Sequence, residues 1–255
     1  GAISHIYYAD RLNQFPLAIF GIAMGVVLLP SLSKAIKNNN IKEIDDTQNR
    51  SLEFSLLISL PSAAGLFILS LPIIHILFER GAFSSEDTIY TSQVLSIFSL
   101  GLPAYILIKV LITCFFARQD TKTPLYISLI TVLLNVAISL MLIGTMREMG
   151  IALATAISAW VNALLLFFIL KFKKNIIIDN FFKKNTFKII IAVLVMIFSC
   201  YILNKIIFSY FTFNLPIKVS GLLLVITFSK IIYLTMIFML KVLSINDLKG
   251  YIKKI

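Results

Sequence analysis

Long apolar runs are the feature that most limits what this chain can fold into. A helix rises about 1.5 Å per residue, so about 20 apolar residues cross the hydrocarbon core of a bilayer. With 59% hydrophobic and 14% charged residues, the 255-residue chain lies outside the range of soluble domains. We predict an all-α polytopic membrane protein with seven transmembrane helices, near residues 15–33, 53–77, 89–116, 124–145, 151–172, 187–210 and 218–243.

The basic residues divide unevenly between the two alternating sets of loops. Of the 23 Lys and Arg residues, 16 follow the first, third, fifth and seventh runs, five lie in the other loops, and two lie inside runs. By the positive-inside rule the richer set faces the cytoplasm. We therefore expect the chain to begin outside and its C-terminus to be cytoplasmic. Basic residues in short loops also argue against a nucleic-acid groove.

The stretch 171–188 is the main predicted internal boundary. It interleaves Lys with Ile and Phe, a pattern typical of a segment that lies on an anionic leaflet. We predict a five-helix bundle over residues 1–172, a cytoplasmic interfacial linker over 173–186, and two further helices with a cytoplasmic tail over 187–255. Because the chain begins with Gly1 rather than Met, we expect it to be a fragment whose N-terminal part is absent.

Two neighbouring runs carry polar stripes at helical spacing. Small residues let helix backbones approach, and hydroxyls and amides bridge helices at roughly 1 kcal/mol each. Packing between the two helices is the favoured interpretation, and a stripe that faces a wet cavity is the alternative. The stripes consist of Ser128, Thr131, Asn135 and Ser139 in the first run and Thr155, Ser158 and Asn162 in the second.

Two cations, Lys109 and Lys230, lie inside apolar runs without a neighbouring carboxylate. An ammonium group at the bilayer centre costs on the order of 3 kcal/mol or more. Lys109 lies about two turns from the end of its run, so its side chain can extend to the membrane–water interface. This structural explanation of its position is as good as a functional one. Lys230 lies about twelve residues, or about 18 Å, from either end. A lipid phosphate, a water-filled groove or a partner in the missing part of the protein would stabilise the charge of Lys230, and Ser229 and Tyr233 could contribute. A helix that ends nearer to Lys230 than the apolar run is the alternative explanation.

Catalytic and metal-binding patterns are missing from the sequence. His5 and His75 are not spaced as metal ligands with each other or with Cys, and no carboxylate joins them as a further ligand. There is no GxSxG, P-loop or HExxH motif. We predict no metal site, no cofactor and no enzymatic activity.

Three separated blocks carry a resemblance to a known family. They are YYADRLNQFPLAIFGIAMGVVLLPSLS from Tyr7, GAFS at 81–84 and FARQDTKTP at 116–124. In this order and spacing they resemble the C-terminal half of the MurJ (MviN) family of lipid II flippases, within the multidrug/oligosaccharidyl-lipid/polysaccharide exporter superfamily. That family has two pseudo-symmetric six-helix lobes around a cavity, followed by two extra helices. The resemblance implies that the seven runs are the second lobe region plus those two helices.

The resemblance also implies an activity and its partners. The family moves lipid II, an undecaprenyl-pyrophosphate-linked disaccharide-pentapeptide, from the inner to the outer leaflet of the bacterial cytoplasmic membrane by alternating access. The expected partners are lipid II, membrane lipids and the missing N-terminal lobe of the same protein, with no nucleic acid. The alternatives are a related exporter of another polyprenyl-linked saccharide or of drugs, and a non-transporting membrane scaffold.

The ADRL motif carries the family's cavity arginine onto Arg11, with Asp10 beside it. A guanidinium suits a pyrophosphate because its planar donor fork binds bidentately and stays charged. Asp10 is expected to orient Arg11 or to contact polar groups of the substrate; an interfacial pair that ends a helix is the alternative. Gln14 stands where many relatives carry Glu. The predicted substrate-binding residues are Asp10, Arg11, Lys109 and Lys230.

Overall fold

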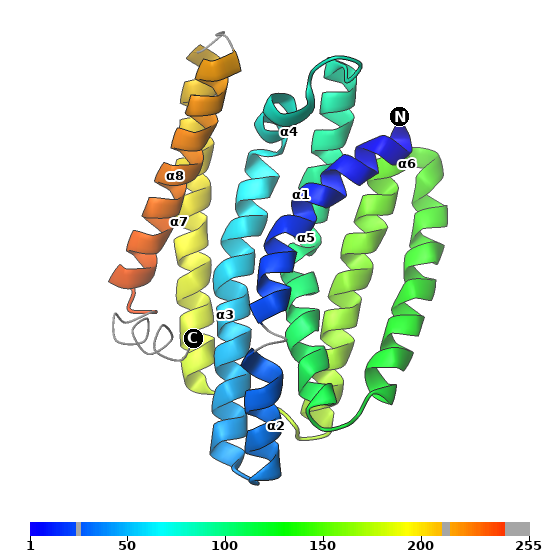
Figure 1. Cartoon of the computed structure of the whole chain (residues 1–255), viewed down its shortest axis with the longest axis vertical. Helices are drawn as coiled ribbons and strands as arrows, with labels where there is room; N and C mark the ends of the chain where they lie inside the picture. The colour runs from blue at the N-terminus through cyan, green and yellow to red at the C-terminus, as the bar shows by residue number, and fades with distance from the viewer. Residues whose placement is uncertain (24–26, 211–214, 243–255) are drawn as a thin grey trace. The chain divides into compact units, whose positions relative to one another are not determined.

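The computed structural model describes residues 1–23, 27–210 and 215–242, and every regular element within them is a helix. The chain divides into two compact units, Gly1–Asp179 and Asn180–Ile255, and each is described by itself. The first contains α1 (Ala2–Ala23), α2 (Leu29–Lys37), α3 (Ile41–Ile68), α4 (Ser70–Phe78), α5 (Ser85–Phe116) and α6 (Lys122–Phe172); the second contains α7 (Asn180–Tyr210) and α8 (Leu215–Met239) (Figure 1).

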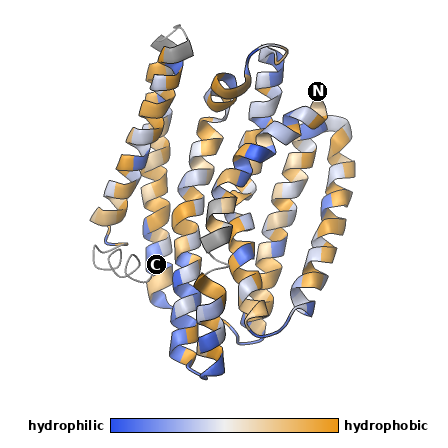
Figure 2. Cartoon of the chain, viewed as in Figure 1, coloured by the Kyte–Doolittle hydropathy of each residue, from blue (hydrophilic) through white to orange (hydrophobic). Residues whose placement is uncertain are grey.

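Five of the described helices are long and apolar enough to cross a membrane, namely α3, α5, α6, α7 and α8. Figure 2 shows hydrophobic residues along these helices. The 51-residue α6 holds two of the expected runs, joined at Arg147, where φ is 49° and ψ is −131°. The first expected run, 15–33, falls on α1, α2 and residues outside the described part. The all-α membrane fold is confirmed, and the count of seven spans stays a prediction.

The start of α5 is defined by a reciprocal capping box. The Ser84 hydroxyl oxygen accepts from the Asp87 backbone N–H at 3.2 Å, and the Asp87 carboxylate accepts from the Ser84 backbone N–H at 2.8 Å. Such a box satisfies two backbone donors at a helix start that have no partner within the helix. It also fixes the Asp87 side chain at one end of the first unit.

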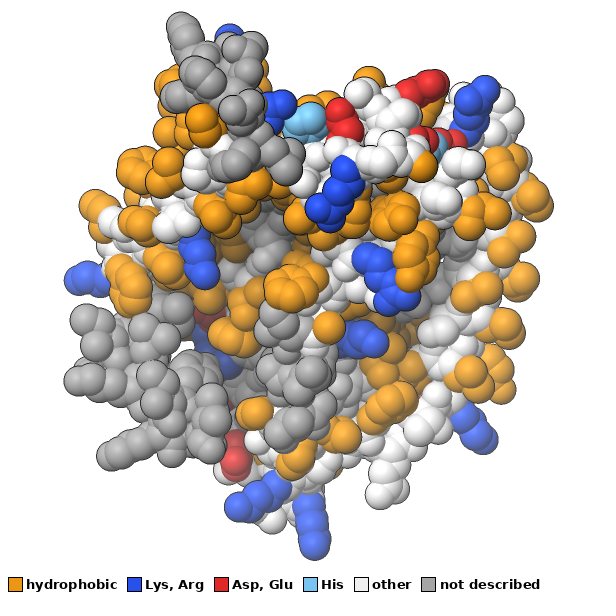
Figure 3. Space-filling model, turned by 45° about the horizontal axis from the view of Figure 1, so that its top comes forward, with side chains coloured by type: hydrophobic (Ala, Val, Ile, Leu, Met, Phe, Trp, Pro, Cys, Tyr) orange, Lys and Arg blue, Asp and Glu red, His pale blue; other side chains and the backbone are white. Residues whose placement is uncertain are grey.

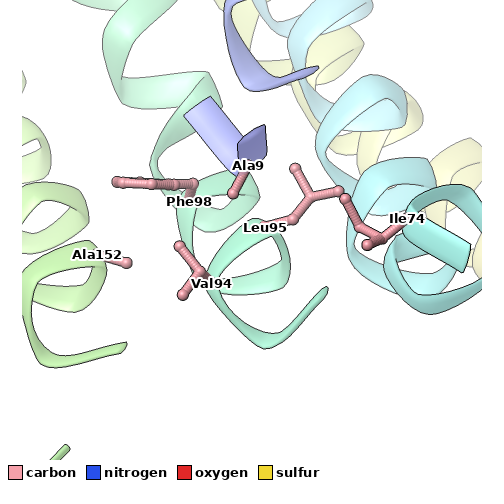
Figure 4. Close-up of a cluster of buried hydrophobic side chains, with 6 residues drawn as sticks. All are labelled: Ala9, Ile74, Val94, Leu95, Phe98 and Ala152. Carbon is pink, nitrogen blue, oxygen red and sulfur yellow. The ribbon is translucent and has the colours of Figure 1, made fainter. Parts of the chain in front are cut away.

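A buried apolar cluster joins four helices near that end (Figure 4). Small side chains on α1 and α6 let these helices come close to α5, as in other membrane bundles. The cluster ties the first half of α1 to the rest of the unit. Its members are Ala9 of α1, Ile74 of α4, Val94, Leu95 and Phe98 of α5, and Ala152 of α6.

The polar stripes of α6 face each other across the turn at Arg147. The Asn135 side-chain amide donates to Thr155 Oγ1 at 3.2 Å, and the Asn162 amide donates to Thr131 Oγ1 at 3.0 Å. The predicted packing role of these stripes is therefore confirmed.

Charged side chains join the loops at the opposite end of the first unit. Arg118 donates to the backbone carbonyl of Asn175 at 2.7 Å, and Lys173 Nζ lies 2.7 Å from Asp120 Oδ2. Arg50 forms an ion pair with Asp179. These contacts tie residues 173–179 to the first unit, while the predicted division into 1–172, 173–186 and 187–255 stays a prediction.

Candidate functional site

Arg11 stands exposed on α1, within the first unit. One of its guanidinium nitrogens donates to Tyr7 Oη at 2.9 Å, and the guanidinium lies 4.8 Å from the centre of the Tyr7 ring. Among the described residues no carboxylate forms an ion pair with Arg11. Tyr7, one helical turn before Arg11, thus orients the guanidinium, and most of its N–H donors remain available to an anion.

Asp10 is half-buried and accepts a hydrogen bond from the Gln14 amide. Successive residues on a helix point about 100° apart, so Asp10 and Arg11 diverge. In this structure Asp10 contacts Gln14 rather than Arg11, so the expected orienting pair is not formed. An amide at position 14 donates to Asp10, whereas a carboxylate there would have repelled it.

Tyr105 of α5 lies close enough to Asp10 for the two to interact electrostatically. Its ring lies over Gly101, where a Cβ would come within 3.0 Å of the ring atoms. Within the described part of the chain, the Tyr105 hydroxyl and Asn13 Oδ1 of α1 are buried without a hydrogen-bond partner. A buried polar group without a partner costs about 1–3 kcal/mol. Each of these two atoms is therefore suited to contact a polar ligand group or water.

Lys109 follows Tyr105 by one turn of α5 and is exposed. It lies seven residues before the helix ends at Phe116, a rise of about 10 Å. No described carboxylate forms an ion pair with it. Figure 3 shows several Lys and Arg side chains among hydrophobic ones on the face of the molecule that this view presents. Asp10 of α1 and Tyr105 of α5 thus lie near each other, and Lys109 lies one turn after Tyr105 on α5.

Lys230 lies on α8 in the second unit and is exposed. Ser229 and Tyr233 are buried, one turn apart on another side of the helix, so they do not share the side of Lys230. The helix ends at Met239, nine residues after Lys230, or about 14 Å. Lys230 is therefore nearer to this helix end than the apolar run predicts, because the last residues of the run lie outside the helix.

Both histidines contact carboxylates, which the sequence analysis missed. His5 Nε2 lies 2.9 Å from Asp87 Oδ1, and its Nδ1 lies 2.9 Å from Glu148 Oε1. His75 Nδ1 lies 2.6 Å from Glu79 Oε2. The last pair has helical i,i+4 spacing and was open to prediction, whereas the partners of His5 are 82 and 143 positions away. Among the described residues there is no cluster of three or more ligands suited to a metal ion.

Two carboxyl groups outside the membrane-spanning segments have shifted pKa values. Partial burial acts to raise the pKa of Glu79, but hydrogen bonds from His75, Thr88 and Ser85 outweigh it, so the pKa lies below its ordinary value. At the other end of the unit, the hydrogen bond from Lys173 lowers the pKa of Asp120 to about 2. Both carboxylates therefore stay ionised at neutral pH and act as fixed acceptors in the loops.

Helices long enough to cross a membrane, with cations set on their apolar surfaces, define the chain as a polytopic helical membrane protein. The family model described as lipid II flippase MurJ matches residues 1–244, and the chain belongs to this family.

Curated relatives and a solved structure agree with this membership. A Rhizobium meliloti protein named probable lipid II flippase MurJ is 49% identical over 167 residues, which is 66% of this chain and 31% of that protein. One of the same name from Buchnera aphidicola of Acyrthosiphon pisum is 35% identical over 253 residues, covering 99% of this chain and 49% of that protein.

A solved structure described as lipid II flippase MurJ, inward closed conformation, is 30% identical with a TM-score of 0.77. The match covers 92% of this chain and 46% of that one. The chain therefore spans about a third to a half of the length of the relatives it matches.

Proposed function

We propose that the full-length protein moves lipid II from the inner to the outer leaflet of the bacterial cytoplasmic membrane by alternating access. The observation that carries the proposal is the family match over residues 1–244, because it covers every helix with a predicted site residue. The names of the relatives support the same substrate. The cytoplasmic membrane, with the N-terminal end outside and the C-terminus inside, follows from the family and the charge of the loops.

The chemistry of the site fits a lipid-linked pyrophosphate. Arg11 offers a planar donor fork to the phosphate oxygens, and Lys109 offers a compact positive charge. Asp10 and the Tyr105 hydroxyl would receive polar groups of the sugar or peptide. No bond breaks in this process, so the protein acts as a transporter rather than as an enzyme. The N-terminal lobe, which the longer relatives contain, would complete the cavity.

Helices α7 and α8 would border the path of the isoprenoid tail. Their apolar surfaces are exposed in the second unit, as Leu194, Phe198, Leu224 and Phe228 show. Lys230 would then hold a phosphate or sit at a wet groove. The hypothesis rests on its depth, and Lys230→Met in the full-length protein tests it. If flipping persisted unchanged in that variant, Lys230 would have no role in transport.

Depletion of the full-length protein in its host tests the proposed activity. Lipid II should still be synthesised but should accumulate in the inner leaflet, measured by its protection from a periplasmic enzyme that cleaves exposed lipid II. Re-expression of the wild type should restore exposure, and Arg11→Ala should not. The exposed loop variant Arg80→Ala serves as the matched control. Normal lipid II exposure during depletion would refute the proposal.

The same experiment separates the two alternatives. An exporter of another polyprenyl-linked saccharide or of drugs would change surface glycans or drug efflux and leave lipid II exposed. A membrane scaffold would tolerate Arg11→Ala, since its role would not require a cation at that place.

A further inference from the structure

One buried histidine joins three helices at one end of the first unit. His5 of α1 is 6% exposed and lies between Asp87 of α5 and Glu148 of α6, with both contacts at 2.9 Å. Glu148 is 5% exposed, and the His5 ring stacks on Tyr90 of α5 at 5.7 Å. The three helices contribute one side chain each, so the cluster is an inter-helix contact rather than a local cap.

A count of protons shows what this cluster requires. Asp87 Oδ2 accepts from both the backbone N–H and the hydroxyl of Ser84, so Asp87 is an ionised acceptor. His5 Nε2 must then donate to Asp87. The short contact between Nδ1 and Glu148 therefore holds one proton, on either the imidazole or the carboxyl group. Without that proton, two lone pairs would face each other at 2.9 Å in a buried site.

The surroundings do not compensate for loss of the proton. With it the cluster carries a net charge of −1, and without it −2. The charged neighbours are Arg147, which acts on Glu148 from the α6 turn, and Arg80, which lines the same cavity as His5 and Asp87. Both are exposed. That cavity has a volume of about 540 Å³, and both His5 and Asp87 line it.

We propose that His5, Asp87 and Glu148 form a proton-held latch that fixes one end of α1 against α5 and α6 and thereby positions Arg11. Arg11 follows His5 by six residues on the same helix, a rise of about 9 Å. Loss of the shared proton repels Glu148 from His5 and loosens this end of α1. His5 is thus a positioning residue, and the part of the inference that concerns Arg11 rests on the proposed function.

Distances between spin labels in the full-length protein test the latch without any lipid II. Labels at the exposed positions Ile3 of α1 and Thr145 of α6 report their separation. We expect a narrow distance distribution at about pH 6 and a broader, longer one at about pH 9, since histidine changes charge within the physiological range. The variant His5→Gln should show the broad distribution at both pH values.

A second variant keeps the proposal falsifiable if His5→Gln does not fold. In Glu148→Gln the side-chain amide can donate to Nδ1 of a neutral imidazole, so the distribution should stay narrow at both pH values. The matched control is His75→Gln, which removes a histidine paired with a carboxylate inside one helical segment and should keep the wild-type response. Identical wild-type distributions at both pH values, or a wild-type response in Glu148→Gln, would overturn the latch.

Flipping of lipid II by the same variants is measured separately. Absence of flipping by the wild type, with the expected distance response, counts against the proposed function alone. Flipping without a distance response counts against the latch alone.

Discussion

At the scale of single residues, the proposed role of Arg11 depends on the geometry of its guanidinium as well as on its charge. Its guanidinium is held over Tyr7 by a hydrogen bond and a cation–π contact. We expect Arg11→Lys to slow lipid II flipping about tenfold or more, because one charged hydrogen bond contributes about 1.5–3 kcal/mol and lysine cannot reproduce the fork. Initial flipping rates in proteoliposomes measure this, with Arg80→Lys as the control. Equal rates for Arg11→Lys and the wild type would contradict a bidentate contact.

Asp120 leads to a prediction about acid stability. The hydrogen bond from Lys173 lowers its pKa to about 2, compared with about 3.9 in an unfolded chain. A carboxyl group with a lowered folded pKa stabilises the fold above the unfolded pKa, and this contribution disappears as the pH falls from about 4 to about 2. The effect is small, because Lys173 is 45% exposed and solvent screens the pair.

Thermal unfolding of the full-length protein measures the contribution of Asp120. The variant Asp120→Asn should unfold at a lower temperature than the wild type at pH 7, and the difference should vanish near pH 2. Asp46→Asn, at an exposed position, should show no such trend. A constant difference across the pH range would mean that the ion pair does not stabilise the loop.

At the scale of elements, the turn inside α6 depends on a close approach at Gly150. A Cβ there would come within 2.8 Å of Leu142 Cβ and 2.9 Å of the Leu142 carbonyl atoms. We expect Gly150→Ala to destabilise the fold by about 1–3 kcal/mol, because backbone atoms must move to relieve the clash. Gly144→Ala is the matched control, since nothing lies within 4 Å of its Cβ position. Chemical unfolding in detergent compares the two, and equal stabilities would contradict this packing.

The sequence predicts long helices well and the ends of helices less well. Apolar runs locate α5 and both halves of α6, since membrane helices must be apolar over their whole length. They miss the start of α1 at Ala2, because polar residues such as His5 and Asn13 lower the local hydropathy although both are buried against other helices. Residues far away in the sequence determine whether such polar residues are buried in a helix, and the local spacing of apolar residues does not indicate those partners.

The candidate site shows the same limit. The resemblance singled out Arg11 and Asp10, and the hydropathy singled out Lys109 and Lys230. Neither indicated that Gln14 would bind Asp10, that Tyr105 would lie close to Asp10, or that His5 would join three helices. These contacts arise from the packing of α1 on α5 and α6, which a single sequence does not determine.

At the scale of the molecule, the first unit has two differently charged ends. His5, Asp87 and Glu148 meet at one end, whereas Arg118, Asp120, Lys173 and Asp179 gather at the other. The membrane orientation predicted from the sequence stays a prediction. Which end faces the cytoplasm is a matter of charge, because loops rich in Lys and Arg stay inside.

Labelling of single cysteines tests this orientation. In a background with Cys114 and Cys200 replaced by Ala, Glu86→Cys and Lys42→Cys place one thiol at each end of the first unit, both at exposed positions. We expect a membrane-impermeant maleimide to label Glu86→Cys in intact cells and Lys42→Cys only after the membrane is opened. The reverse pattern would put the loop at 117–121 outside and would contradict the orientation that we propose. Because both variants replace a charged residue at an exposed position, a difference in labelling reports the side of the membrane rather than local burial.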